Sequence, residues 1–276
     1  MTLLLSLYFA CCVAFASAGM VNLTLNILFL LKEVFLFLVC YAIFQQNEAM
    51  MDNLREVCPL SGPPPLAVFI MQQFFSTNVN VSRADYLGRP ALKVAFTDEY
   101  QKNYAINGVV QANAYVRIPL TYFYEGTIEV DIAAERNSYA DEFSRAFAGV
   151  AFRLQPDINK ETYDLVYLRM TNGLLSNPPP PEPRNVRAIQ YISPPNWHFD
   201  TLREQFPGQY EAGAKIAEKR WNHLRITVKN NTASVFIDYD PKAVLSVSML
   251  GTRSPGPIAF WVDDATTAYF SNLQIY

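Results

Sequence analysis

Three side chains suited to sugar recognition share one face of a predicted strand. In the segment 163–170 (YDLVYLRM), Tyr163, Tyr167 and Arg169 occupy alternate positions. Successive side chains of a strand point to opposite faces, so these three point the same way. A flat aromatic ring stacks on the apolar face of a sugar ring, and a guanidinium donates paired hydrogen bonds to neighbouring hydroxyl groups. The spacing therefore favours a carbohydrate-binding surface on this strand.

Further side chains of the same kind follow in the next forty residues, at the end of this strand, on the strand after the Pro-rich loop, and in the loop after that. The predicted carbohydrate-binding residues are Tyr163, Tyr167, Arg169, Asn172, Gln190, Trp197 and Arg203. Gln190 and Tyr191 are adjacent on a strand, so at least one of them lies outside the site. The alternative is that the tyrosines pack inside the fold and that Arg169 and Arg203 pair with nearby carboxylates.

The usual catalytic and metal-binding motifs are missing from the sequence. His198 and His223 are the only histidines, and there is no H-E-x-x-H segment, phosphate-binding loop or serine in a nucleophile-elbow context. We therefore predict no catalytic residue, no metal ligand and no cofactor. The net charge of −3 offers no basic stripe for a phosphate backbone, which argues against nucleic acid as a partner.

The elements that must position these residues are short strands. Each alternates apolar with polar residues or forms a short apolar run, and Gly, Pro or Asn bounds it. The predicted strands are 91–96, 114–118, 124–134, 149–154, 163–170, 186–193, 210–217, 221–229, 233–238, 244–247, 258–262 and 268–275. Asn230-Asn231 predicts a tight turn between two of them. The Pro-rich stretch 172–184 and the stretch 194–206 are predicted loops, and no segment of the body shows a useful helical period. The pattern predicts an all-β, two-sheet antiparallel jelly-roll sandwich.

The N-terminal region has a different composition. Residues 1–49 are apolar enough for a signal peptide or a membrane anchor, residues 50–65 form a Pro-rich linker, and residues 66–276 form the sandwich domain. A signal peptide that begins at Met20 and an N-terminal anchor or hairpin are both compatible with the pattern. Either would make the domain secreted or extracytoplasmic, with a membrane tether as a possible partner. No cysteine follows Cys58, so the domain is predicted to fold without a disulfide.

Several strings in the body resemble a known superfamily. They are GTIEVDIA (126–133), AGVAFR (148–153), YDLVYLRMTNG (163–173), VRAIQYISPPNW (186–197), RWNHLRITVKNNTASVFID (220–238) and AFWVDDATTAYFSNLQI (259–275). Over about residues 85–276 the chain resembles the concanavalin A-like lectin/glucanase superfamily. More narrowly, it resembles a group of largely uncharacterised secreted bacterial proteins with a laminin-G-like jelly roll. That superfamily includes lectins, hydrolases and adhesion modules, so the resemblance implies the fold more strongly than the activity.

Two details of the resemblance concern acidic residues. Laminarinase-type hydrolases of the superfamily carry Glu-x-Asp-x-Glu or Glu-x-Asp-x-x-Glu on one strand, with the two glutamates as catalytic groups. In this sequence Glu129, Asp131 and Glu135 are spaced one residue further, which favours an ordinary solvated strand face. Laminin-G-like modules often hold Ca²⁺ on loop carboxylates. Asp263-Asp264 is interpreted instead as a solvated turn.

The preferred functional prediction is therefore an extracytoplasmic module that binds a glycan or polysaccharide without catalysis. A glycoside hydrolase that pairs Glu129 or Asp131 with Glu211 is one alternative. A structural or protein-adhesion module is the other.

Overall fold

The computed structural model describes residues 75–107, 113–155 and 161–276, and all of these belong to one unit. The predicted N-terminal segment 1–49 and the linker 50–65 lie outside the described residues, and so does the predicted start of the domain at residue 66. Among the residues that are described, no helix is long and apolar enough to cross a membrane.

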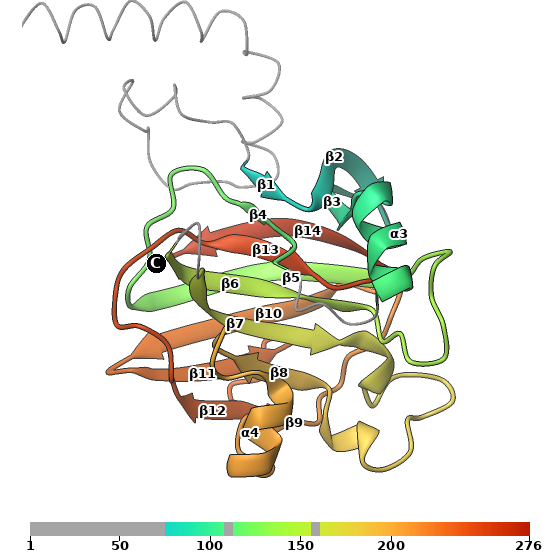
Figure 1. Cartoon of the computed structure of the whole chain (residues 1–276). Coiled ribbons are helices and arrows are strands. Elements are labelled where there is room, and N and C mark those ends of the chain that lie inside the picture. The colour runs from blue at the N-terminus through green and yellow to red at the C-terminus, as the bar shows by residue number, and fades with distance from the viewer. Residues whose placement is uncertain (1–74, 108–112, 156–160) are drawn as a thin grey trace, which may run out of the picture. The chain divides into compact units, whose positions relative to one another are not determined.

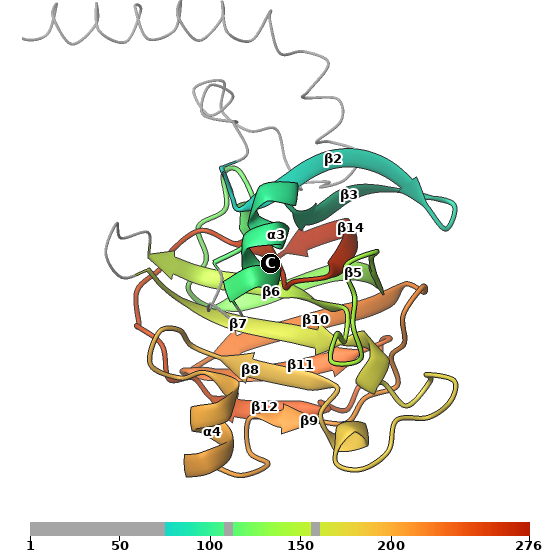
Figure 2. The same ribbon diagram turned by 45° about the vertical axis from the view of Figure 1, so that its right-hand side comes forward.

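The chain folds into two seven-stranded antiparallel sheets that pack face to face (Figures 1 and 2). The first sheet has the order β1 (Ser76–Thr77), β4 (Tyr115–Arg117), β13 (Ala259–Val262), β6 (Phe147–Gln155), β7 (Thr162–Arg169), β8 (Ile189–Ile192) and β9 (Glu211–Ala212). The second sheet has the order β12 (Leu245–Ser248), β11 (Thr232–Ile237), β10 (Asn222–Lys229), β5 (Gly126–Arg136), β14 (Thr266–Ile275), β3 (Arg89–Phe96) and β2 (Val79–Tyr86). The predicted two-sheet sandwich is confirmed.

Alternation along the strands builds the core between the sheets. Ile128, Val130 and Ile132 of β5 are fully buried and belong to the central hydrophobic cluster. Phe260 of β13 stacks on Phe270 of β14 with ring centroids 4.1 Å apart, so this pair connects the two sheets through the core. Offset or stacked aromatic pairs stabilise a core beyond their buried area.

Local turn chemistry also follows the prediction. Lys229 pairs with Thr232 across a two-residue turn, and Asn230 and Asn231 have φ values of 49° and 61°. Asparagine tolerates this left-handed region better than most residues, and a turn with two such residues matches the twist of a hairpin. The predicted turn is therefore confirmed.

The structure adds helices that the sequence pattern did not indicate. Helix α3 covers Asp98–Asn107, helix α4 covers Phe199–Gln205, and the 3₁₀-helices η2 and η3 cover Met170–Asn172 and Arg184–Val186. Two acidic residues open α3, where they interact favourably with the helix dipole. Helix α4 lies within the predicted loop 194–206, beside β8 and β9 (Figures 1 and 2). The predicted strand 210–217 shrinks to the two residues of β9.

Candidate functional site

The outer face of the first sheet carries one continuous row of chemically distinctive residues. Met170 follows β7 and its sulfur contacts Nδ2 of Asn222 from the second sheet at 3.6 Å, so the even-numbered residues of β7 face the core. Tyr163, Tyr167 and Arg169 therefore face outward. The register aligns Tyr115, Trp261, Gly149, Tyr167, Gln190 and Glu211 across the strands from β4 to β9.

Four of the predicted binding residues meet on this outer face but are buried there. Tyr163 and Tyr167 are 3% exposed, Arg169 is 4% exposed and Gln190 is 0% exposed. Arg169 Nη2 donates to the Tyr167 hydroxyl at 2.9 Å and to Gln190 Oε1 at 3.0 Å. Tyr167, Arg169 and Gln190 thus bond to one another, whereas the Tyr163 hydroxyl donates to Asn113 Oδ1 at 3.1 Å. Tyr191 faces the core, where its hydroxyl donates to Asp164.

Arg169, Arg187 and Arg203 surround a single carboxylate and form what we call the arginine cluster. Glu211 Oε2 lies 3.3 Å from Arg169 Nη1 and 2.6 Å from Arg203 Nη2, and its Oε1 lies 3.1 Å from Arg187 Nε. Only 7% of the Glu211 side chain is exposed, whereas 32% of Arg187 and 27% of Arg203 remain accessible. Arg169 and Arg203 thus pair with a carboxylate, as the packing alternative expected.

Helix α4 positions Arg203 over the outer face. The guanidinium groups of Arg203 and Arg169 lie 5.0 Å and 5.5 Å from the ring centroid of Phe199, which opens the helix and is exposed. Such cation–π contacts hold a guanidinium plane without consuming its hydrogen-bond donors. Trp197 is half-buried beside this helix, and its ring packs on Phe206 at 6.0 Å. Trp197 and Arg203 are therefore the predicted residues that keep accessible surface.

Asn172 connects the outer face to the Pro-rich loop. It is 4% exposed, its Nδ2 donates to the carbonyl of Arg187 at 3.0 Å, and its Oδ1 accepts from Arg184 Nε at 2.9 Å. Arg184 Nη2 also donates to the carbonyl and the hydroxyl of Thr171, at 3.1 Å and 3.3 Å. Asn172 is thus a structural connector, and the side chain that it supports is Arg184.

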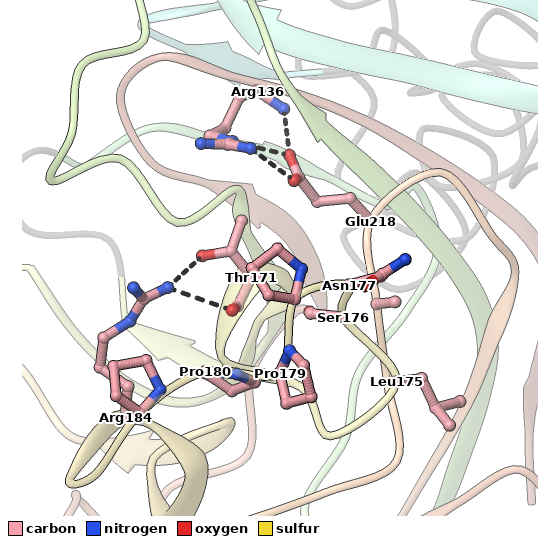
Figure 3. A pocket seen from close by; sticks show the side chains of 12 residues that line it. Arg136, Thr171, Leu175, Ser176, Asn177, Pro179, Pro180, Arg184 and Glu218 are labelled. Carbon is pink, nitrogen blue, oxygen red and sulfur yellow. Dashed lines mark hydrogen bonds and ion pairs between the residues drawn. The ribbon is translucent and has the colours of Figure 1, made fainter.

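Arg184 lines a pocket of about 380 Å³ at one end of the sandwich (Figure 3). We call it the proline-loop pocket. Its lining residues are Arg136, Thr171, Leu175, Ser176, Asn177, Pro178, Pro179, Pro180, Pro181, Arg184, Ala217 and Glu218. Three separate parts of the chain meet here: the end of β5, the segment from η2 to η3, and the segment before β10. In Figure 3, Arg184 lies across from the pair Arg136 and Glu218, with Thr171 between them, and Pro179 and Pro180 lie on the adjoining loop.

On one side of this pocket, a carboxylate neutralises the charge of an arginine. Arg136 donates through Nε and Nη2 to the two oxygens of Glu218 at 3.1 Å and 3.0 Å, in the bidentate geometry typical of this pair. Arg145 lies near the pocket. Burial lowers the pKa of Arg145, and the charges of Arg184 and Arg136 lower it further, against Asp141 and Glu142. Sequence reasoning missed Arg136, Arg184 and Arg187; the prolines that frame Arg184 were the signal available.

The acidic residues Glu129 and Asp131 lie on the outer face of the second sheet. Asp131 is buried in a network, where His223 Nδ1 lies 2.8 Å from its Oδ1 and where Arg89 and Asn272 donate to its Oδ2 at 2.9 Å and 2.7 Å. Burial opposes the charged form, but these hydrogen bonds outweigh it, so the pKa of Asp131 lies below its ordinary value. The expected solvated strand face is therefore wrong for Asp131.

This placement also removes one predicted catalytic pair. Glu211 lies on the outer face of the first sheet, whereas Glu129 and Asp131 lie on the outer face of the second. A retaining glycosidase needs its two carboxyl groups about 5–5.5 Å apart, and an inverting one about 6.5–9.5 Å apart. Carboxylates on opposite outer faces of a sandwich have the whole core between them, so this pair cannot act on one glycosidic bond.

Asp263 and Asp264, which follow the end of β13, both have raised pKa values. Burial raises the pKa of Asp263 to about 7, and the neighbouring charge of Asp264 raises it too. Burial likewise raises the pKa of Asp264 to about 6. The Asp263 side chain keeps some accessible surface although protein surrounds most of it. In the described part of the chain, no group of three or more His, Cys, Asp or Glu side chains is placed to hold a metal ion.

Comparisons with known proteins give structural neighbours only. No protein-family model matches the chain, and no curated protein matches it. The carbohydrate-binding module CBM66 from Bacillus subtilis is 13% identical, with a TM-score of 0.42 over 73% of this chain and 98% of that one. A Bacillus subtilis protein with a galectin-like fold is 10% identical, with a TM-score of 0.43 over 72% of this chain and 87% of that one.

A Bacillus licheniformis β-glucanase is 10% identical, with a TM-score of 0.40 over 73% of this chain and 93% of that one. Identities of 10–13% and TM-scores of 0.40–0.43 describe a distant likeness and assign no function to this chain.

Proposed function

We propose that this chain is a carbohydrate-binding module that acts outside the cytoplasm, and that the proline-loop pocket is where a glycan binds. The observation that carries the proposal is the composition of the pocket wall. Proline rings and Leu175 supply rigid C–H surface, while Thr171, Ser176, Asn177 and the arginines supply hydrogen-bonding groups within one cavity of about 380 Å³. Ligand pockets combine apolar walls with a few placed polar groups in this way, and a sugar ring presents both kinds of surface.

The buried outer-face residues have a supporting role in this proposal. Arg169 and Asn172 both donate to the carbonyl of Arg187, at 3.4 Å and 3.0 Å, which fixes the chain between Arg184 and the arginine cluster. Binding groups on a loop act best when a rigid scaffold holds the loop. Arg203, which keeps accessible surface and shares Glu211 with Arg187, would contact the parts of a longer glycan that extend beyond the pocket.

A glycan-array screen together with soluble polysaccharides tests the proposal, with product analysis on every ligand found. We expect binding without cleavage. Asn177→Trp, which fills the pocket from an exposed position, should abolish that binding. Lys242→Trp is the matched control, because it adds the same ring to an exposed turn of the second sheet. The absence of any saccharide ligand would refute the proposal and favour a protein-adhesion module, and cleavage products would favour a hydrolase.

A further inference from the structure

Arg184 carries a positive charge that only neutral groups hold in place. Its guanidinium is half-buried and donates to Asn172 Oδ1 and to the two oxygens of Thr171. Within residues 75–107, 113–155 and 161–276, no carboxylate forms an ion pair with it. Partial burial of a charge is costly unless an opposite charge compensates it, so the site favours an anion from outside.

The one carboxylate in the pocket wall does not supply this compensation. The Glu218 carboxylate accepts three hydrogen bonds from Arg136. The backbone nitrogen of Arg136 donates at 2.9 Å, and its Nε and Nη2 donate at 3.1 Å and 3.0 Å. In a bidentate pair of this kind the two charges neutralise each other, and both carboxylate oxygens already accept hydrogen bonds from the arginine. The lining residues of the proline-loop pocket therefore carry one positive charge in excess, on Arg184.

Glu182, two residues before Arg184, is exposed, does not line the pocket and forms no ion pair with Arg184 in the described part of the chain. Arg145 lies close enough to Arg184 and Arg136 for their charges to lower its pKa, after the larger effect of burial. Asp141 and Glu142 act in the opposite direction on Arg145, but they do not line the pocket. Nη1 of Arg184 makes no hydrogen bond within the described residues, so the group keeps donors for a ligand.

We infer that the glycan bound in the proline-loop pocket is acidic, with an anionic substituent that binds the Arg184 guanidinium while its sugar ring lies against the prolines. This inference rests on the proposed function. A carboxylate of a uronic acid and a sulfate ester share the required chemistry, since both present paired oxygens to a planar fork of N–H donors. A neutral glycan would leave the Arg184 charge uncompensated and bind more weakly.

Two matched pairs of polymers test the inference on the full chain by isothermal titration calorimetry. Polygalacturonate is compared with its methyl ester, and dextran sulfate with dextran, so that each pair shares a sugar backbone and only one member carries the anionic group. We expect at least one charged polymer to bind at least tenfold more tightly than its neutral partner, because charge-assisted hydrogen bonds are stronger than neutral ones. The pair that shows the difference identifies carboxylate or sulfate as the substituent.

Variants then locate the binding group. Arg184→Gln should lower the affinity for the charged polymer at least tenfold. Arg253→Gln should leave this affinity unchanged. The substitution removes the same charge from an exposed position in the loop 251–255, and this loop packs against Asp164 at the end of β7 away from the pocket. Asn177→Asp adds a negative charge to the pocket wall without changing its size or the Arg184 hydrogen bonds, so it should weaken binding of the charged polymer even if Arg184→Gln disturbs the loop.

The outcomes separate this inference from the proposed function. Equal affinities within both polymer pairs, or unchanged affinity in both Arg184→Gln and Asn177→Asp, would overturn the inference. A neutral glycan that binds the pocket in the array screen would then leave the proposed function standing. If no saccharide of either kind binds, both fail.

Discussion

Glu211 offers a sharp test of how the outer face is held together. Glu211→Gln keeps the size of the side chain but removes the charge that faces Arg169, Arg187 and Arg203. Arg187 and Arg203 are about one-third and one-quarter exposed, so they can turn toward water, whereas Arg169 is only 4% exposed. Removing one partner of a buried ion pair costs about 3–5 kcal/mol, because the other charge stays buried without compensation. We expect a loss near the lower end, about 3 kcal/mol, since glutamine still accepts one hydrogen bond.

Equilibrium unfolding in urea, extrapolated linearly to water, measures this loss. Glu218→Gln is the control, because it breaks a similar bidentate pair whose arginine is 45% exposed and should lose about 0–1 kcal/mol. The double variant Arg169→Met, Glu211→Gln should recover part of the stability, because it leaves no buried charge unpaired but removes the donor to Gln190 Oε1. Equal losses below about 1 kcal/mol for Glu211→Gln and Glu218→Gln would refute the argument that burial decides the effect.

Three further predictions concern stability. Because the pKa of Asp263 is about 7 in the folded chain and its ordinary value is 3.8, ionisation destabilises the fold as pH rises from about 4 to 7. Asp263→Asn should therefore be more stable by about 1–2 kcal/mol at about pH 8 and unchanged at about pH 3.5, after allowance for partial exposure, and denaturant titrations at both pH values check this. Phe260→Ala leaves a cavity against Phe270 and should lose about 3–5 kcal/mol in the same assay; a loss below about 1 kcal/mol would contradict the stacked core. Gly149→Ala places a Cβ 2.2 Å from the Val166 carbonyl oxygen and should lower the melting temperature, since overpacking costs about 1–3 kcal/mol; an unchanged melting temperature would refute the close approach.

The sandwich could be predicted because strand alternation is a local property. The segment that became β5 alternates Ile128, Val130 and Ile132 with polar residues, and the structure buries those three. Strand β2 escaped prediction because its edge position needs little apolar surface: four of its eight residues are exposed and only Val79 is buried. Helix α3 was not predicted because its sequence DEYQKNYAIN has no apolar stripe. Its buried Gln101 accepts a hydrogen bond from the backbone N–H of Ala265 through Oε1.

The site was predictable only in part, because distant segments complete it. Spacing placed Tyr167 and Arg169 on one face, and the structure agrees. Nothing local indicated that Arg169 would meet Glu211, 42 residues later in the chain. The proline-loop pocket is harder still, since Arg136 and Glu218 come from segments 82 residues apart. Long-range contacts of this kind depend on the whole sheet topology and not on any one motif.

The position of β14 in the second sheet determines when this sheet can fold during synthesis. Residues Thr266–Ile275 lie between β5 and β3 in the middle of the second sheet, and they pair with both. During synthesis, β2 and β3 can form a hairpin early, but they cannot join β5 until residue 275 has left the ribosome. The second sheet therefore closes only after translation of the domain is complete. Until then the nascent polypeptide stays open, a state that chaperones can engage.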